Sequence, residues 1–285
     1  GLLMTQFLSF LFIVLWSSSF ITGKLIIENG SPFASLSFRF AIVALGFLFF
    51  ALFYKERVLV NLKNIFESTF SGILFHGLYL GGCFYSFSIG VPASITALIV
   101  SMQPILTNIL AGPILNEKIT WKQWIGIILG FFGTFLVLGI EIDNTIPLNG
   151  FIATIVALIA ATTGTLWQKK LSLNLPLSVS NFYQALGASV FLFIIMFVFE
   201  DYFININLQF ILPMSWQIIA VSFGAFTILM YLIKVGSASQ TSNLFFLIPP
   251  VSALMGWFFI NENITSYDIF GLILCSFGVF IATKK

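Results

Sequence analysis

Residues 93–120 read ASITALIVSMQPILTNILAGPILNEKIT, and residues 238–265 read ASQTSNLFFLIPPVSALMGWFFINENIT. Both stretches are apolar with proline near the middle, and both end in Asn-Glu shortly before a threonine. Apolar matches are common in any hydrophobic chain, so the polar, proline and glycine matches are the informative ones. An offset of 145 residues gives identical residues at Ala93, Ser94, Thr96, Pro104, Asn116, Glu117, Thr120, Gly126 and Gly133. We therefore expect a duplication, with residues 1–145 and 146–285 as two halves of one structural domain.

The composition places this duplicated chain in a membrane. Its residues are 59% hydrophobic and only 8% charged. A globular protein of 285 residues needs more polar residues than this to cover its surface. The formal net charge is only +2, and no block of Lys and Arg is present. We therefore expect the lipid bilayer as a partner, and no nucleic acid.

The apolar runs predict an all-α integral membrane protein. About 20 apolar residues are needed to cross roughly 30 Å of hydrocarbon as a helix. Ten runs meet this requirement, and they predict ten transmembrane helices at residues 7–27, 33–54, 68–89, 93–115, 121–140, 149–168, 176–199, 214–233, 238–260 and 266–283.

The distribution of charges predicts the orientation of these helices. Cytoplasmic loops of membrane proteins are enriched in Lys and Arg. If both termini are cytoplasmic, all but two of the 12 Lys and Arg residues fall in inner loops or at the C-terminus. The exceptions are Lys24 and Arg39, which lie within predicted helices. Each half then holds five helices, and because five is odd, the second half enters the membrane from the opposite face. The ten helices therefore form two inverted five-helix repeats, a construction of many secondary transporters.

The prolines of the repeated stretch predict interrupted helices near the middle of the membrane. Pro104 lies inside one predicted helix, and Pro249 and Pro250 lie inside its repeat partner. Each proline lacks an N–H group and frees the carbonyl four residues earlier, which gives Val100, Phe245 and Phe246. Symmetry-related interruptions of this kind point to the substrate site and its hinges. The alternative is a pair of kinks that neighbouring Ser and Thr side chains satisfy.

Arg39 is the most informative charge. It lies about seven residues after Pro32, or roughly 10 Å into its helix, and an ionisable group at that depth indicates function. A guanidinium can hold a carboxylate or phosphate through two parallel hydrogen bonds. The alternative is a structural arginine that binds backbone carbonyls or Glu28. Its repeat partner is Gln184, so only one half presents a cation.

Further polar and aromatic residues inside the predicted helices are candidates to line a binding site. His76 and Tyr79 are three residues apart and share one helical face. As a set, such groups suit a small polar solute held by neutral hydrogen bonds and aromatic walls, although each alone is also typical of packing. With Arg39, the candidate substrate-binding residues are Trp16, His76, Tyr79, Gln103, Trp167, Gln184, Tyr231 and Asn243.

The sequence lacks the residues that several classes of protein function require. No Asp or Glu lies in the central part of a predicted helix, which disfavours proton-driven export of cationic drugs. There is no GxxxxGK[ST] loop, no His/Cys cluster for a metal, and no nucleophile with a base. We therefore expect no enzyme, no cofactor and no metal. A scaffold or channel subunit remains an alternative, because Gly126, Gly130 and Gly133 can form an oligomer contact.

Local motifs resemble the EamA family of the drug/metabolite transporter superfamily. They are Trp16-Ser-Ser-Ser-Phe20, Ser37-Phe38-Arg39-Phe40, and the two proline-containing stretches followed by Trp124-x-Gly126 or Phe270-Gly271. The resemblance covers essentially the whole chain. It implies one helical domain with a central cavity lined mostly by the first, third, fourth, sixth, eighth and ninth helices.

The expected function follows from this resemblance and from Arg39. We expect a secondary transporter in a bacterial inner membrane that moves a small polar metabolite, such as an amino acid or a related carboxylate or zwitterion. Export is the direction that the family favours, and the protein is expected to be a monomer or homodimer. The alternatives are an importer or exchanger of a nucleotide or sulfonium cofactor, and an exporter of small cations or drugs.

Overall fold

The computed structural model describes residues 1–91, 96, 99–138, 147–171, 174–261 and 263–284. Within these ranges the regular structure is helical, and one isolated antiparallel bridge joins Gly30 to Ile204. The expected all-α fold is therefore confirmed. Ala93, Ser94 and Glu262 of the repeated stretch, and the boundary at residue 145, lie outside the described residues.

The first half contains five membrane-crossing segments. Three elements, α3, η1 and α4, follow one another without a break and form the third segment. The elements are α1 (Leu2–Asn29), α2 (Pro32–Phe53), α3 (Leu62–Gly72), η1 (Ile73–Leu80), α4 (Gly81–Ser88), α6 (Gln103–Leu115) and α7 (Trp121–Leu138).

The second half repeats this order. The eighth crossing segment is again built of three continuous elements, and the ninth is divided by a short 3₁₀ segment. The elements are α8 (Leu148–Leu171), α9 (Leu177–Phe199), α10 (Leu208–Trp216), η2 (Gln217–Ala225), α11 (Phe226–Val235), α12 (Ala238–Ser242), η3 (Asn243–Leu247), α13 (Ile248–Ile260) and α14 (Ser266–Thr283).

The third and eighth crossing segments begin six residues earlier than the apolar runs predict. The third segment begins at Leu62 and the eighth at Leu208, whereas the predictions start at residues 68 and 214. In each case an asparagine caps the helix: Asn61 accepts from the Asn64 N–H, and Asn207 accepts from the Phe210 N–H. Such caps satisfy N–H groups that have no partner inside the helix. The cap thus sets the start of these helices, outside the most hydrophobic part.

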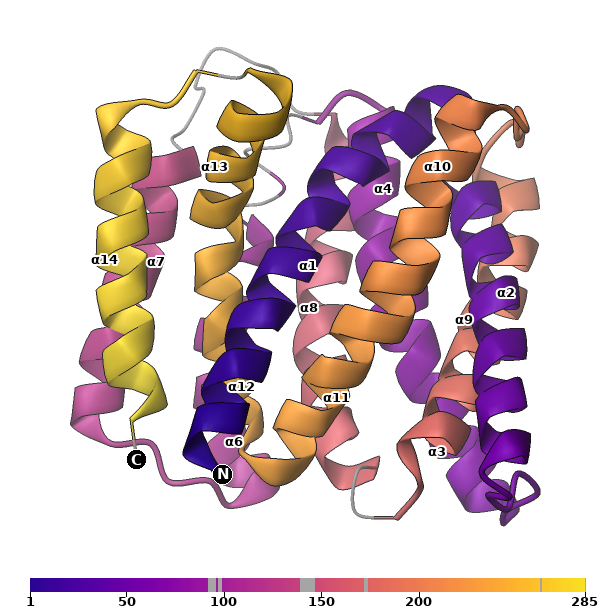
Figure 1. Cartoon of the computed structure of the whole chain (residues 1–285), viewed down its shortest axis with the longest axis horizontal. Coiled ribbons are helices and arrows are strands. Elements are labelled where there is room, and N and C mark those ends of the chain that lie inside the picture. Colours follow the sequence, from indigo (N-terminus) through magenta and orange to yellow (C-terminus); the bar gives the residue numbers. More distant parts are fainter. Residues whose placement is uncertain (92–95, 97–98, 139–146, 172–173, 262, 285) are drawn as a thin grey trace.

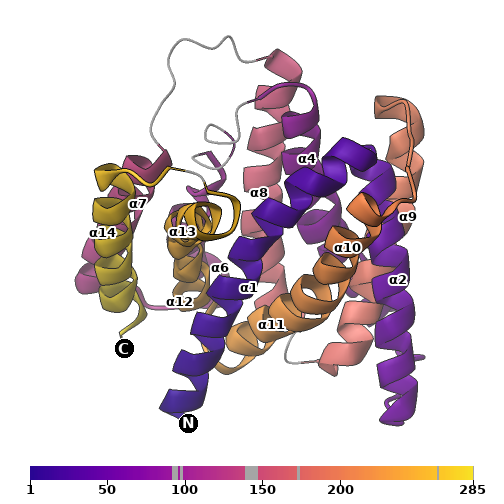
Figure 2. The ribbon, with the colours of Figure 1, turned by 45° about the horizontal axis from the view of Figure 1, so that its top comes forward.

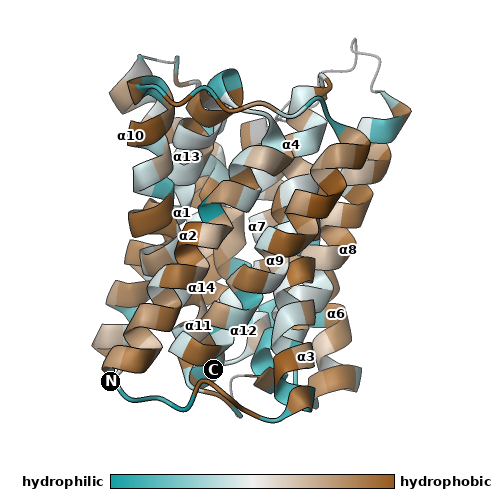
Figure 3. Ribbon diagram, turned by 90° about the vertical axis from the view of Figure 1, so that its right-hand side faces the viewer, coloured by the Kyte–Doolittle hydropathy of each residue, from teal (hydrophilic) through white to brown (hydrophobic). Residues whose placement is uncertain are grey.

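The helices cross a membrane-sized layer and bring both termini to one end. Seven helical segments within the described residues are long and apolar enough to span a bilayer, and Trp121–Val137 is a shorter apolar helix. The N- and C-termini lie at the same end of the bundle, as ten crossings require (Figure 1). Apolar residues cover the long sides of the bundle and polar residues gather at its two ends (Figure 3). The molecule is therefore a multi-pass membrane protein.

Two helix pairs show the inverted repeat most clearly. α7 packs along α14, and α2 packs along α9, so each pair joins corresponding helices of the two halves (Figure 1). A Cβ on Gly126 would lie 2.4 Å from the Gly278 carbonyl, and one on Gly133 would lie 2.8 Å from the Gly271 carbonyl. The glycine stripe of α7 is therefore a contact within the chain.

The prolines of the repeated stretch begin helices. Pro104 lies in the first turn of α6, and Pro249 and Pro250 lie in the first turn of α13. The first-turn N–H groups of a helix have no intrahelical acceptor, so proline costs little there. Two carbonyls that the prolines were expected to free have partners: Ile248 N–H donates to Phe245, and Thr134 Oγ1 donates to Phe246 at 3.1 Å.

The central part of the bundle is organised around α1. It lies between the α12–η3–α13 segment on one side and the α10–η2–α11 segment on the other (Figures 1 and 2). α1 therefore contacts the interrupted ninth segment and the composite eighth segment of the second half. It also forms one wall of the cavity described below.

Candidate functional site

A narrow cavity of about 80 Å3 lies between the two halves of the chain. This state therefore holds a constricted site, smaller than the roughly 300–1,000 Å3 of typical small-molecule pockets. Its walls come from α1, α2, the η1–α4 segment, residues before α6, η2 and the η3–α13 segment. The lining residues are Trp16, Ser19, Phe20, Arg39, Tyr79, Leu80, Cys83, Phe84, Phe87, Thr96, Val100, Ser101, Gln217, Val221, Phe245, Ile248 and Pro249.

Arg39 places a guanidinium in this cavity from α2. Its side chain is only 3% exposed. Nε donates a hydrogen bond to Ser222 Oγ and Nη1 donates to Gln217 Oε1, both at 2.9 Å. The guanidinium carbon lies 5.1 Å from the centre of the Phe40 ring. These partners are all uncharged, so within the described residues the guanidinium has no ion pair, and Glu28 is not among its partners.

Gln217 connects Arg39 to α1. Its amide oxygen accepts from Arg39, and its Nε2 donates to the Ser19 carbonyl at 3.0 Å and to Thr22 Oγ1 at 3.1 Å. One amide thus joins α2, η2 and α1, and it fixes the guanidinium at the cavity wall. Gln217 and Ser222 are not among the residues that the sequence predicts for the site. A glutamine within the apolar run of residues 214–233 is the signal that points to it.

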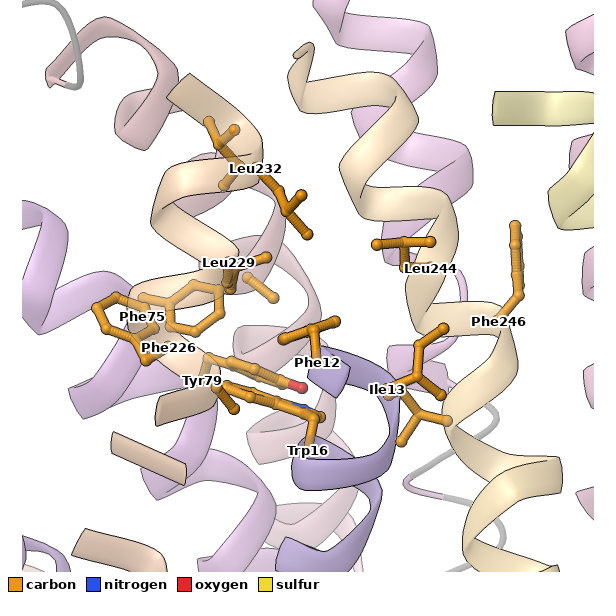
Figure 4. Packing of buried hydrophobic residues seen from close by; sticks show 14 of the residues in the cluster. Phe12, Ile13, Trp16, Phe75, Tyr79, Phe226, Leu229, Leu232, Leu244 and Phe246 are labelled. Carbon is orange, nitrogen blue, oxygen red and sulfur yellow. The ribbon is translucent and has the colours of Figure 1, made fainter. Parts of the chain in front are cut away.

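Aromatic side chains form the wall of the cavity that lies toward the termini. Trp16 packs against Phe245 and Phe75, with ring centres 5.8 and 6.1 Å apart, and Phe75 packs against Tyr79 at 5.2 Å. Trp16 and Tyr79 thus both pack against Phe75, and all three belong to one buried cluster (Figure 4). Phe12 and other buried apolar residues continue this packing beyond Trp16. The cavity is therefore closed on the side of the termini.

On the other side the cavity continues toward the far end of the bundle. A second hollow shares Phe20, Phe84 and Phe87 with it and extends along α1 past Gly23 to Glu28. This direction leads away from the N-terminus of α1, and so away from both termini. The side chain of Lys24 lies outside the described residues.

Polar contacts join α6 to the ninth segment on the closed side. The Glu117 carboxylate follows α6 and accepts from the backbone N–H groups of Ala238, at 3.0 Å, and Ser239, at 3.2 Å, and also from the Ser239 hydroxyl. Asn108 Nδ2 donates to Asn243 Oδ1 at 2.8 Å. A carboxylate at a helix N-terminus is stabilised by the N–H groups and by the helix dipole. The two proline-containing segments are thus held together at this end.

Of the residues expected to bind substrate or form hinges, the cavity brings together Trp16, Arg39, Tyr79 and Pro249. His76 is buried beside the cavity between Phe40 and Phe226, with 4.4 Å between ring centres in each case. Pro104 and Pro250 lie in helix first turns outside the lining. The structure thus places a subset of the expected residues in one site.

The remaining expected residues make other contacts. Gln103 donates to Thr107 and Thr165, Gln184 pairs with Gln168, and Asn243 accepts from Asn108. Trp167 packs on Phe70 with ring centres 5.3 Å apart, and Tyr231 is 37% exposed. These contacts link helices around the cavity, and none of these side chains lines it.

Comparison with known proteins identifies the family. A sequence profile of the EamA-like transporter family matches residues 3–139 and residues 148–284. The chain belongs to the EamA-like transporter family. The two matches place one copy of the family unit in each half of this EamA-like protein.

Relatives of this EamA-like protein are named as transporters. It is 28% identical to the uncharacterized transporter YyaM of Bacillus subtilis, over 95% of this chain and 91% of that protein. It is 27% identical to a probable amino-acid metabolite efflux pump of Escherichia coli, over 58% of this chain and 53% of that protein. A crystal structure with 17% sequence identity has a TM-score of 0.81 over 98% of this chain and 96% of that chain. The last likeness shows the fold alone.

Proposed function

We propose that this EamA-like protein is a secondary transporter that moves a small polar metabolite, an amino acid or a related carboxylate or zwitterion, by alternating access. The observation that carries the proposal is Arg39. Its guanidinium is 3% exposed, lines a cavity between the two halves and has only uncharged partners within the described residues. A buried cation without a counter-ion favours an anionic group of a solute as its partner.

The shape of the cavity supports alternating access. It is open toward the end away from the termini and closed by Trp16, Tyr79 and their neighbours toward the termini. With the termini in the cytoplasm, as the distribution of cations predicts, this state faces outward. The inward-facing state then requires the contacts of Glu117 and Asn108 with the ninth segment to break. The inverted repeat provides the symmetry for such an exchange.

The direction of transport and the location of the protein are part of the same proposal. The printed name of the Escherichia coli relative, a probable amino-acid metabolite efflux pump, supports export. We propose the bacterial inner membrane as the location, with both termini cytoplasmic. The cavity lies within a single chain, so a monomer or a homodimer can carry out this function.

The residues of the cavity distinguish this proposal from its alternatives. An exporter of cationic drugs needs a buried acid to bind its substrate, whereas Arg39 is the charged residue among the described lining residues. A nucleotide carries several negative charges, and a single guanidinium is a poor match for them. A monocarboxylate or an amino acid fits a single cation best.

Counterflow in proteoliposomes tests the proposal. Vesicles that contain the purified protein and an unlabelled amino acid or carboxylate should take up the labelled form of the same solute. Arg39→Gln should lower this uptake at least tenfold, while Arg57→Gln, which removes an exposed arginine at a surface loop, should leave it unchanged. If the wild-type protein exchanges none of these solutes, the proposed function is wrong; uptake that Arg39→Gln does not change removes Arg39 from the site.

A further inference from the structure

The cavity combines one cation with no anion. Arg39 is the charged side chain among the described lining residues, and these include no aspartate or glutamate. A guanidinium has five N–H donors, and Arg39 uses two of them for Ser222 and Gln217. Three donors therefore remain for a ligand. An ammonium group bound among these lining residues meets a like charge, while the Glu28 carboxylate lies farther out, in the second hollow.

The interruption of the ninth segment offers little to replace the missing carboxylate. In some transporters, carbonyls freed by broken helices bind the cationic group of a ligand or ion. Here the Phe245 carbonyl accepts from Ile248 N–H, and the Phe246 carbonyl accepts from Thr134 Oγ1. Both carbonyls are therefore engaged inside the protein, and neither has to bind an ammonium group to be satisfied.

Most of the other lining side chains are aromatic or aliphatic, although Ser19, Cys83, Thr96 and Ser101 also line the cavity. Phe20, Phe84, Phe87, Val100 and Phe245 are among the side chains that line it. The polar groups nearest to the guanidinium belong to one connected set, in which Gln217 bonds both Arg39 and the Ser19 carbonyl. A ligand that fits has one anionic end at this set and an apolar body against the phenylalanines.

We propose that the site selects amphipathic monoanions, in which a single carboxylate binds Arg39 and an aromatic or branched body fills the apolar cavity, and that it disfavours the ammonium group of an amino acid. This inference rests on the proposed transport function and narrows its substrate class from amino acids and carboxylates to carboxylates. A carboxylic acid without an amino group should bind at least about tenfold more tightly than the amino acid with the same side chain.

Four ligands with one phenyl body test this selectivity. They are 3-phenylpropionate, 3-phenylpropionamide, phenylalanine and phenethylamine, which differ in charge at one end. Affinities are measured by calorimetry on the full-length protein in detergent. We expect 3-phenylpropionate to bind tightest, with phenylalanine at least about tenfold weaker and phenethylamine not detected. Equal affinity for phenylalanine and 3-phenylpropionate, or tightest binding of phenethylamine, overturns the proposal.

Variants assign the selectivity to the guanidinium. Arg39→Gln should remove the preference for 3-phenylpropionate over its amide, and Arg57→Gln should keep it. A preference that survives in Arg39→Gln contradicts the role of Arg39. If Arg39→Gln does not fold, as its ligand-free melting temperature will reveal, the order of the four ligands on the wild-type protein still decides the selectivity.

Transport of the same ligands separates this inference from the proposed function. If phenylalanine exchanges across proteoliposomes as well as 3-phenylpropionate does and binds equally well, the selectivity is wrong and the transport function stands. If 3-phenylpropionate binds in the expected order but no solute exchanges, the selectivity stands and the transport function is wrong.

Discussion

Glu117 holds α6 against the N-terminus of α12, and its replacement by glutamine should shift the protein toward the state that opens on the side of the termini. The carboxylate accepts two backbone N–H groups and one hydroxyl. Hydrogen bonds to a charged group contribute about 1.5–3 kcal/mol each, and a charge at a helix N-terminus about 0.3–1 kcal/mol. Glutamine keeps one acceptor oxygen but loses the charge and the second oxygen. We expect a net loss of about 2 kcal/mol for this half-buried group, which corresponds to a roughly 30-fold change in the equilibrium between the two states.

The native cysteines provide the assay. Cys83 lines the cavity, whereas Cys275 is fully buried between α7 and α14. A membrane-impermeant thiol reagent should therefore reach Cys83 only from the open side of the bundle. In Glu117→Gln, labelling of Cys83 from the side away from the termini should fall, and labelling from the side of the termini should rise.

A control variant and the labelling rates of Glu117→Gln test this prediction. Glu56→Gln removes an exposed carboxylate from the loop between α2 and α3, and it should leave both labelling rates unchanged. If Glu117→Gln also leaves both rates unchanged while its melting temperature stays near the wild-type value, Glu117 does not hold the closed side. The reasoning from its three hydrogen bonds would then be refuted.

Two further predictions concern helix packing and the prolines. Gly133→Val should lower the melting temperature sharply, because even a Cβ at this position would lie 2.6 Å from Cys275 Sγ and 2.8 Å from the Gly271 carbonyl. Gly112→Ala should change the melting temperature little, because the nearest atom to its Cβ lies 3.6 Å away. Equal melting temperatures of the two variants would contradict the close α7–α14 contact. Pro104→Ala and Pro249→Ala should each reduce the transport rate more than they reduce the amount of folded protein. The reason is that alanine allows the helix to continue into the preceding turn. Counterflow at wild-type rates in both variants would refute the role of the interruption.

The sequence predicts much of the fold because hydrophobicity alone specifies where a helix can cross the membrane. The apolar runs locate the crossing segments, and the repeated proline and glycine positions identify α6 with α13 and α7 with α14. Helix starts at Leu62 and Leu208 are less accessible to this reasoning, because Asn61 and Asn207 cap them outside the apolar runs. Length and hydrophobicity therefore determine the topology, while capping determines the boundaries.

The site is harder to predict because it depends on the rotation of each helix. Arg39 stands out as a charge in an apolar run, but its partners Ser222 and Gln217 come from another segment whose orientation the sequence does not reveal. Trp167 and Tyr231 are polar aromatic residues of the same kind as Trp16 and Tyr79, yet they lie outside the cavity lining. Residue type alone does not distinguish these two pairs.

The pairing of Arg39 also has a consequence for the order in which the chain is made. Its partners Gln217 and Ser222 follow 178 and 183 residues later. At about 5–20 residues per second, α2 waits roughly 10–40 s for them, with a guanidinium whose insertion costs about 2.5–3.5 kcal/mol. During this interval the nascent chain holds an unpaired charge at membrane depth, which is a natural target for quality-control proteases. Substitutions at Gln217 and Ser222 should therefore affect how much protein survives synthesis, even where the completed molecule tolerates them.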